Sequence, residues 1–598
     1  MKASRRKLLS VLPASLLLGG AAMASDKTRK GNENTIKEGS FSTPQSYGIE
    51  PGEVVHGDAM AKLISAGGDI RFIKPGVYLT DRTLVIPSMT RLWIGSGVTI
   101  KLADNSNCNI FQNQAYYDNA DVPDERIEIS GLGEIDFNGH KQNTSGLTHM
   151  CSILKNIKDL KLGGGVKVLN ANKYAWLVAK IDRLTVDGLN FDTYSDGLHC
   201  QPPINHAYIR NIKGKTGDDM LAFTIGDYAN YDISEPGDFS NVDVAGLFCE
   251  SALCAVKITG NDTGVFDKFR ITGIYGNTKH AVFRIWGDTN LLSTKVRSLT
   301  VEDIHAMPAD GYPVVDIDDR KFASGKYGIE IDSAVFRNVY NSSADDQTIR
   351  ISSTVGTMIH NLLVDNPPRY SVTVIGLNHV SSTVENLTIC NGNTEFPDDA
   401  NSCVVLNRGT INRINIQNYR AIFSSVNTGS IARMIGSCMV NEVNFNGIWQ
   451  ENGVSGWVNI NSSMATPTTL NISNYTCSGK GRIAQTLSSI LKVKMKNVCV
   501  INGSPANKPF YARGGEIILS GDLDCEYNTI ASDNGGVITI ASGMHNIFCD
   551  VSLLKARDAT AVINTNDSLS CGSGMVIAQD NSWRNLSSGA TYKNNNKI

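Results

Sequence analysis

The sequence predicts an all-β chain, and three features of its composition support this. Hydrophobic residues make up 41%, which is enough for a buried core and argues against global disorder. Charged residues make up only 19%, and much of the remaining polarity comes from Asn, Ser, Thr and 55 glycines. Proline is scarce, with 17 residues in 598, which argues against long linkers. Many short strands joined by turns are typical of such a composition.

Charge and cysteine content exclude several classes of protein. The 55 basic and 58 acidic residues give a formal net charge of -3, so we expect no nucleic-acid partner. The 13 cysteines form no CxxC pair, which argues against a zinc site and against a complete disulfide framework. Many of them follow an apolar residue in a strand-like run and are expected to be small buried hydrophobes. We therefore expect neither a metal nor a cofactor.

The first 25 residues have the pattern of an export signal or a short anchor. A basic start with the pair Arg5-Arg6 precedes an apolar run at 11–18 and a small-residue end. Such segments are typical of secretory signals, and the paired arginines of the twin-arginine type. The apolar run is too short for a stable membrane span. We expect 1–25 to be signal-like or an anchor, and 26–57 to be a polar linker or head segment.

From residue 58 onwards, repeated phrases predict a solenoid of strands. A helix-like segment at 58–64 comes first, and short β-branched runs then alternate with Asn, Gly and Asp turns. If Gly188, Ile212, Gly246 and Gly273 are equivalent, the steps are 24, 34 and 27 residues. Repeats of this length that contain strands but no helix indicate coils of a β-solenoid.

The competing repeat fold is a propeller, whose blades need about 40–45 residues and four strands each. The shorter repeat favours a right-handed parallel β-helix over 58–425. Beyond about residue 425 the coil phrase is lost although turn signals persist. We expect a smaller C-terminal β-domain at 430–598.

Three carboxylates lie one coil apart in this repeat. Asp196 precedes a glycine, and the pair Asp218-Asp219 follows one, at separations of 22 and 23 residues. Residues one coil apart stack at about 4.8 Å, so the three side chains should converge. Crowded like charges raise the pKa of at least one group, and an acid beside a carboxylate base can cleave a glycosidic bond. Either motif alone would be interpreted as an ordinary Asp-Gly or Gly-Asp turn, but together they favour a catalytic site.

Several stretches match the motifs of one family in order. Residues 131–139 read GLGEIDFNG, close to G-x-G-x-I-D-G-x-G, and 170–176 read NANKYAW, similar to N-S-x-x-W. Asp196 with its glycine stands in place of N-T-D-G, and 217–219 in place of G/Q-D-D. The region 131–286 thus resembles the polygalacturonase-type glycoside hydrolases of family 28, which are right-handed β-helices.

The resemblance implies roles for the three carboxylates. Asp218 would be the general acid that protonates the leaving oxygen, while Asp196 and Asp219 would hold the water that attacks. It also implies inversion of configuration, for which the carboxyl groups usually lie about 6.5–9.5 Å apart.

Two departures from the family bear on the substrate. The family's G-H-G falls near 253–255, where the histidine is missing, and its R-I-K corresponds to 284–286, where Arg284 is kept and Trp286 replaces the lysine. Because that Arg and Lys are expected to bind a uronate, polygalacturonate is a poor candidate substrate. Trp286 offers a face for a sugar ring, or simply packs at a turn. We take Arg284, Trp286, His280 and Lys257 as candidate substrate-binding residues.

The stretch 67–102 resembles the entry region of bacteriophage tailspikes, which degrade capsule or O-antigen. That resemblance implies a homotrimer in the virion that binds a bacterial polysaccharide and contacts phage tail or baseplate proteins. The region 430–598 would then serve in trimerisation or carbohydrate binding. We favour this reading.

Three alternatives stay open. The twin-arginine start favours an exported bacterial family 28-like glycosidase, periplasmic or secreted, that acts on an environmental polysaccharide. A polysaccharide lyase, with calcium held by acidic residues, is a second alternative. A non-catalytic carbohydrate-binding solenoid is the third.

Overall fold

The computed structural model describes residues 41–580, apart from a set of internal segments. These are 262, 288–293, 320–327, 342–346, 353–355, 372, 398–401, 425–428, 437, 454, 460–468, 479–481, 487–491, 502–509, 526–529, 534–536, 541–544, 550–551, 557–561 and 566–575. The predicted export signal at 1–25 lies outside the described residues, as do residues 26–40 of the predicted linker. No described helix has both the length and the apolar character to cross a membrane.

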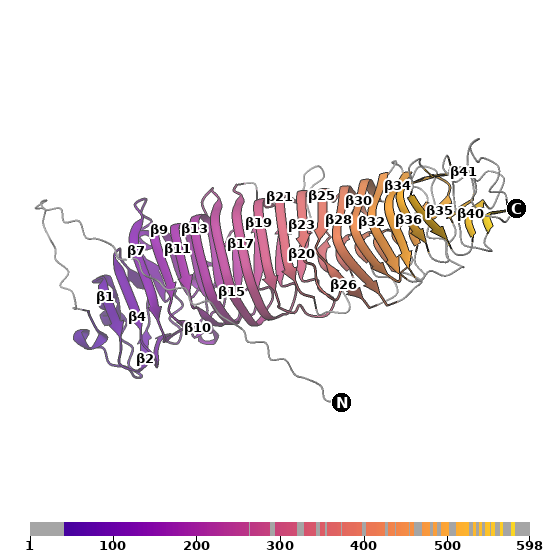
Figure 1. Cartoon of the computed structure of the whole chain (residues 1–598). Helices are drawn as coiled ribbons and strands as arrows, with labels where there is room; N and C mark the ends of the chain where they lie inside the picture. Colours follow the sequence, from indigo (N-terminus) through magenta and orange to yellow (C-terminus); the bar gives the residue numbers. More distant parts are fainter. Residues whose placement is uncertain are drawn as a thin grey trace, which may run out of the picture. The chain divides into compact units, whose positions relative to one another are not determined.

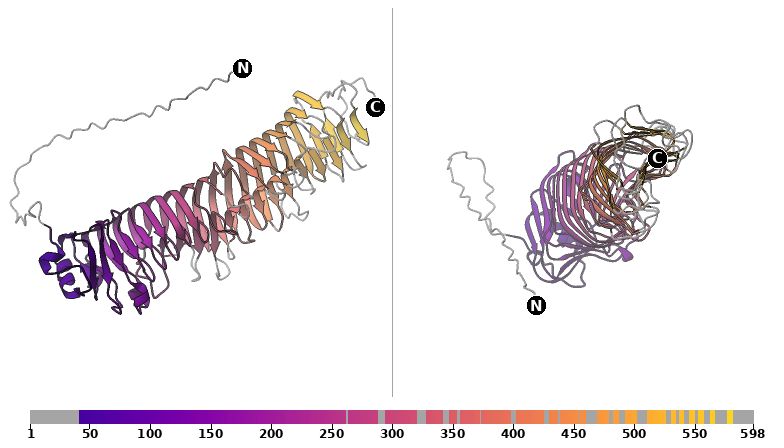
Figure 2. Two further views of the ribbon diagram at one scale, coloured as in Figure 1. Left: turned by 90° about the horizontal axis from the view of Figure 1, so that it is seen from below. Right: turned by 45° about the vertical axis from the view of Figure 1, so that its right-hand side comes forward.

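The strands of each coil form parallel pairs with the strands of the next coil, and they lie side by side in Figure 1 and Figure 2. The predicted right-handed parallel β-helix is confirmed. Hydrogen bonds connect the strands into three ladders. The first ladder contains β1 (Gly68–Phe72), β4 (Thr90–Ile94), β7 (Asp124–Gly131), β9 (Ser152–Gly163), β11 (Trp176–Asp187), β13 (Leu198–Lys215), β15 (Phe239–Ala252), β17 (Phe266–Thr278), β19 (Thr294–Ile304), β21 (Ile329–Val339), β23 (Thr357–Asp365), β25 (Thr383–Cys390), β28 (Gly409–Phe423), β30 (Cys438–Glu451), β32 (Thr469–Ser478), β34 (Lys492–Ile501), β36 (Glu516–Cys525), β38 (Val537–Ile540) and β41 (Val562–Thr565).

The other two ladders complete each coil. The second contains β2 (Gly76–Thr80), β5 (Val98–Leu102), β8 (Glu134–Asp136), β10 (Lys167–Leu169), β12 (Asn190–Asp192), β26 (Asn393–Phe396) and β39 (His545–Cys549), and it is continued by the ends of long strands such as β13, β28 and β36. The third begins with β3 (Leu84–Ile86) and β6 (Phe111–Asn113) and passes through the first residues of β9, β11 and β13. It continues with β14 (Leu221–Thr224), β16 (Val256–Gly260), β18 (Phe283–Gly287), β20 (Val315–Asp319), β22 (Gln347–Ile351), β24 (Thr373–Leu377), β27 (Ser402–Leu406), β29 (Ser430–Met434), β31 (Ser455–Asn459), β33 (Arg482–Thr486), β35 (Phe510–Arg513), β37 (Ile530–Asp533), β40 (Ser552–Ala556) and β42 (Val576–Asp580).

The core lies inside the coils because apolar residues alternate with polar ones along the strands. In β5, for example, residues that point inward are buried and alternate with residues that are partly exposed. Ten cysteines have side chains that the structure describes; all ten are free and seven are buried, as expected of small hydrophobic residues. The predicted helix at 58–64 is α1 (Gly57–Ser65), and its residues Met60, Leu63 and Ile64 are fully buried. The remaining helices are short: η1 (Pro44–Tyr47), α2 (Gln114–Tyr117), η2 (Gly139–Lys141) and η3 (Gly146–His149).

A column of left-handed residues explains the repeated phrases in the sequence. Strand register places a residue with φ between 49° and 80° at the same bend of fourteen successive coils: Gly164, Gly188, Asn211, Gly246, Gly273, Asp303, Asn338, Asn366, Asn391, Asn418, Gly447, Asn474, Asn497 and Gly521. Glycine and asparagine tolerate this conformation best. Our equivalence of Ile212 with Gly188 was wrong by one residue, because Asp187 pairs with Arg210 and the matching residue is Asn211.

The ladders continue beyond the point where we expected the coil phrase to end. β28 pairs with β30, and β30 with β32, in the same parallel register that earlier strands use. The left-handed column also continues, through Gly447 to Gly521. The described strands after residue 430 therefore extend the solenoid, and a role in trimerisation or carbohydrate binding stays a prediction.

Candidate active site

The three predicted carboxylates converge at the turn that leads into the third ladder. One oxygen from each of Asp196, Asp218 and Asp219 lies within 4.8 Å of the others. Leu198 pairs with Leu221, and the amide of Asp196's neighbour Gly197 donates to the carbonyl oxygen of Asp219 at 3.0 Å. Asp196 and Asp219 thus hold the same position on successive coils, and Asp218 precedes it. The predicted convergence is correct.

A threonine two residues earlier shapes the turn on several coils. Thr216 Oγ1 donates to the carbonyl of Asp218 at 2.8 Å, and Thr193 Oγ1 donates to the carbonyl of Ser195 at 3.0 Å. Thr278 repeats this contact with the carbonyl of His280 at 2.7 Å. Because these hydroxyls are buried in the fold, the turn and the carboxylates that it carries are held in one conformation.

Burial separates the three carboxylates into two kinds. Asp196 and Asp219 are 3% and 1% exposed, whereas Asp218 is half-buried and faces outward. Burial, reinforced by the like charges of Asp196 and Asp219, raises the pKa of Asp218 to about 6. Burial also raises the pKa of Asp219, although the ammonium of Lys257 opposes this. Among the described residues no hydrogen-bond donor reaches Oδ1 of Asp219, an oxygen that is buried from solvent.

Lys257 is part of the carboxylate cluster itself. Its Nζ lies 3.3 Å from Oδ2 of Asp219, and 4.7 Å from the centroid of the Trp286 ring. Although burial would lower it, the charges of Asp219, Asp196 and Asp218 raise the pKa of Lys257. Carboxylates this close could also hold a cation, but the ammonium already supplies the compensating charge. We therefore do not identify them as metal ligands.

Arg284 and Trp286 lie on β18, two coils beyond Asp219. The Arg284 side chain is 4% exposed; its Nη2 lies 3.4 Å from Asp318 and its Nε 3.7 Å from Asp316. Its guanidinium also lies 4.1 Å from the centroid of the Trp286 ring. Arg284 is therefore paired with carboxylates of the chain itself. The cationic groups of Lys257 and Arg284 both lie over the Trp286 ring. Sugar stacking on Trp286 stays a prediction.

His280 occupies the position of Asp218 two coils further along. Its ring lies 3.9 Å from the ring of Tyr312, and its amide donates to the carbonyl of Leu253. It belongs to the same outer turn as the carboxylates but not to their cluster. Its predicted role in substrate binding is untested.

The candidate site residues predicted from the sequence do not include two polar residues that lie close to Asp196. His199 Nδ1 lies 2.8 Å from Oδ2 of Asp196, and the ring of Tyr174 stacks on His199 at 3.7 Å. Asp227 lies on the other side of the imidazole, with Oδ2 3.3 Å from Nε2. His199 comes three residues after Asp196, so proximity alone could have indicated it. Asp227 lies in an irregular segment after β14, where coil spacing gives no position.

The separation of the carboxylates differs from the expectation. Oxygens within 4.8 Å of one another are closer than the roughly 6.5–9.5 Å that inverting enzymes usually need to admit water. The cause is the one-coil stacking itself, which places equivalent residues at the inter-strand spacing. Inversion, which the family resemblance implies, stays a prediction.

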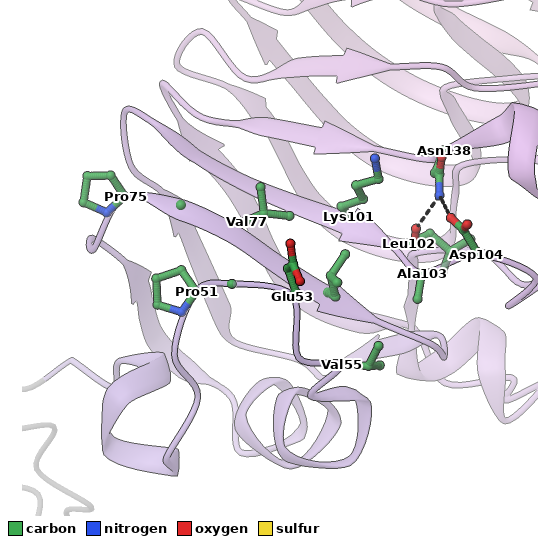
Figure 3. A pocket seen from close by; sticks show the side chains of 13 residues that line it. Pro51, Glu53, Val55, Pro75, Val77, Lys101, Leu102, Ala103, Asp104 and Asn138 are labelled. Atoms are coloured by element: carbon green, nitrogen blue, oxygen red, sulfur yellow. Dashed lines mark hydrogen bonds between the residues drawn. The ribbon is translucent and has the colours of Figure 1, made fainter.

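A cavity of about 800 Å³ lies at the first coils, apart from the carboxylates (Figure 3). Three of its polar side chains have partners: Asn138 Nδ2 donates to the Leu102 carbonyl at 3.1 Å and to Asp104 at 2.8 Å, and Lys101 lies 3.2 Å from Asp136. The apolar part of its lining includes Pro51, Val55, Pro75, Val77 and Leu79. None of the lining residues belongs to the carboxylate cluster.

Comparison with known proteins gives only distant likenesses. No protein-family model matches the chain, and no curated protein does. A family 28 exopolygalacturonase of Yersinia enterocolitica is 14% identical with a TM-score of 0.39, covering 66% of this chain and 79% of that one. A hyperthermoactive exopolygalacturonase from Thermotoga maritima is 12% identical with a TM-score of 0.36, covering 64% and 92%. The pre-mature gene product 12 of bacteriophage phi29 is 12% identical with a TM-score of 0.39, covering 92% and 73%. Because these scores are low, we draw no conclusion about activity from them.

Proposed function

We propose that the protein is a glycoside hydrolase that cleaves a bacterial surface polysaccharide such as capsule or O-antigen. One observation carries the proposal: a half-buried carboxyl with a pKa of about 6 lies beside two buried carboxylates on the outer face of the solenoid. A protonated acid next to carboxylate bases is the chemistry that hydrolysis of a glycosidic bond requires. The outer face is open to a polymer, which an enclosed pocket would exclude.

Each carboxylate has a role in the proposed reaction. Asp218 donates its proton to the glycosidic oxygen as the bond to the anomeric carbon breaks. Asp196 and Asp219 hold a water and accept its proton as its oxygen attacks that carbon. Lys257 offsets the negative charge of the pair. Because Asp218 must be protonated, kcat/KM should fall as the pH rises through about 6. NMR of the first-formed anomer decides between inversion and retention.

The environment of Arg284 favours a substrate that is neutral at this subsite. A uronate would need a cation to bind its carboxylate, but the buried Arg284 is already paired with Asp316 and Asp318. We therefore expect cleavage of glycans with neutral sugars at the scissile bond in preference to polygalacturonate. A panel of purified capsule and O-antigen polysaccharides, with product sizing, tests this preference.

The proposal that the protein is a phage tailspike rests on the sequence alone. It predicts a homotrimer that assembles with phage tail proteins in the virion, and sedimentation equilibrium measures the oligomeric state. A monomer would favour the exported glycosidase instead. A lyase would be recognised by unsaturated products that absorb in the near ultraviolet, which hydrolysis does not form.

The Asp218→Asn substitution tests the proposal directly. We expect loss of at least about 10²-fold in kcat on the glycan that the parent cleaves, because the amide cannot donate an acidic proton. Binding of that glycan should persist. Asp192→Asn is the matched control, since Asp192 is an exposed carboxylate on β12 outside the cluster. Parent-like cleavage by Asp218→Asn would refute the assigned acid.

A further inference from the structure

The ring of His199 lies between two carboxylates that approach it from different parts of the chain. Nδ1 is 2.8 Å from Oδ2 of Asp196, and Nε2 is 3.3 Å from Oδ2 of Asp227. Asp196 belongs to the turn before β13, whereas Asp227 belongs to the segment after β14. The side chains of His199, Asp196 and Asp227 are 4%, 4% and 6% exposed, so solvent does not screen these contacts.

The two neighbours determine the charge of the ring. Nδ1 makes a hydrogen bond to Asp196, whereas Nε2 faces Asp227 at ion-pair distance without hydrogen-bond geometry. A carboxylate at each nitrogen favours a proton on both, which makes the ring an imidazolium. Although burial would lower it, the contacts with Asp196 and Asp227 raise the pKa of His199 to about 9. Against the opposing effect of burial, the contact with His199 and the hydrogen bond from Tyr174 lower the pKa of Asp227 to about 2.

Further contacts fix the ring in its place. The Tyr174 ring stacks on it at 3.7 Å with an interplanar angle of 9°, and the Tyr174 hydroxyl donates to Oδ2 of Asp227 at 2.7 Å. Gln201 Nε2 donates to the same oxygen at 3.1 Å. The titratable groups that face His199 are thus Asp196, Asp227 and Tyr174, from three different segments. Asp227 is held from three directions and serves as a fixed point for the imidazolium.

We propose that His199 is a positioning residue for Asp196: the imidazolium, anchored by Asp227 and Tyr174, holds the Asp196 carboxylate in place beside Asp218 and Asp219. Like charges in the cluster would otherwise drive Asp196 away from the geometry that holds water. The role rests on the proposed function, because it presumes that Asp196 acts on the reacting water. His199 itself does not touch the substrate.

The first test is His199→Gln, which removes the charge but keeps a polar side chain of similar reach. On the glycan that the parent cleaves, we expect kcat to fall about 10- to 100-fold while KM stays unchanged. The control is His360→Gln, since His360 also contacts a carboxylate, Glu385 at 2.9 Å, but on another surface of the solenoid. That variant should cleave like the parent. A parent-like kcat for His199→Gln would overturn the proposal.

The second test does not depend on activity. In ¹⁵N-histidine NMR spectra, with the His199 signals assigned through the missing resonances of His199→Gln, the parent ring should remain an imidazolium up to about pH 9. Asp227→Asn should lower that titration point and reduce kcat, because it removes one of the two anchoring charges. A ring that titrates near its ordinary value in the parent would overturn the proposal even if His199→Gln were inactive. If the parent cleaves no glycan, the proposed function fails. The spectra still decide whether His199 is charged between Asp196 and Asp227.

Discussion

The raised pKa of Asp218 should cost the folded protein stability. The folded state keeps the Asp218 proton up to about pH 6, whereas the unfolded chain loses it near 3.8. Stability therefore falls as the pH rises from 3.8 to 6, and the loss is complete above that range. Asp218→Asn removes this loss and also the repulsion from Asp196 and Asp219.

We expect Asp218→Asn to unfold at a temperature higher than the parent by roughly 1–3 °C at pH 8, with no difference at pH 3.5. Calorimetry across this pH range measures it, with Asp192→Asn as the control. A gain that is the same at every pH would mean that the Asp218 carboxyl is not held protonated by its surroundings.

Single residues also show where prediction from the sequence ends. Asp196, Asp218 and Asp219 could be brought together from spacing alone, because one coil returns the chain to the same position. The pairing of His199 with Asp227 could not be predicted from spacing, because Asp227 lies in an irregular segment that is not part of the repeat. Arg284 was expected to face the substrate, yet Asp316 and Asp318 on the next strand bind it. Which charges neutralise one another depends on register, which the sequence gives only to within a residue.

At the scale of single elements, the turns before β14 and β18 share one threonine contact but carry different side chains at the equivalent position. Thr216 supports the turn that carries Asp218, and Thr278 supports the turn that carries His280. Replacing either by valine leaves the shape of the side chain and removes one buried hydrogen bond, which costs about 1 kcal/mol. The two variants therefore separate a loss of stability from a loss of geometry at the carboxylates.

We expect Thr216→Val and Thr278→Val to lower stability to a similar degree in urea unfolding. Only Thr216→Val should reduce kcat, by roughly 10-fold, because a small displacement of Asp218 misaligns the proton donor. If both variants cleaved the glycan equally well, the turn would be shown to have little influence on the acid.

The bend between the first and second ladders shows which residue types the sequence uses to form a turn. Asparagine or glycine at this bend avoids the strain of a left-handed backbone, and asparagines also stack: Asn366 Nδ2 donates to Oδ1 of Asn338 at 2.8 Å. Six glycines and seven asparagines of the chain stand at this one bend. The exact equivalence of one coil with the next needed strand register, because coils differ in length by the size of their outer loops.

At the scale of the whole molecule, the stack of coils accounts for the length of the chain. Each described strand of the third ladder pairs only with the strands of neighbouring coils, as β16 does with β14 and β18. Stability in such a fold is close to a sum of local terms, so distant coils should respond independently to substitution. The carboxylate cluster depends on the coils around β13 to β18. The coils that follow β28 are free to differ in sequence without altering it.

Two substitutions of the same kind test this independence. Ile258 on β16 and Ile472 on β32 are both buried in the core, at 0% and 2% exposure, and alanine at either site should cost about 2–5 kcal/mol locally. We expect Ile258→Ala to reduce cleavage, because its neighbour Lys257 contacts Asp219. Ile472→Ala should leave cleavage unchanged and raise hydrogen exchange only in β30, β32 and β34. If Ile472→Ala instead raised exchange in β13 to β16 and lowered kcat, the coils would form one cooperative unit, and distant coils would then contribute to the geometry of the site.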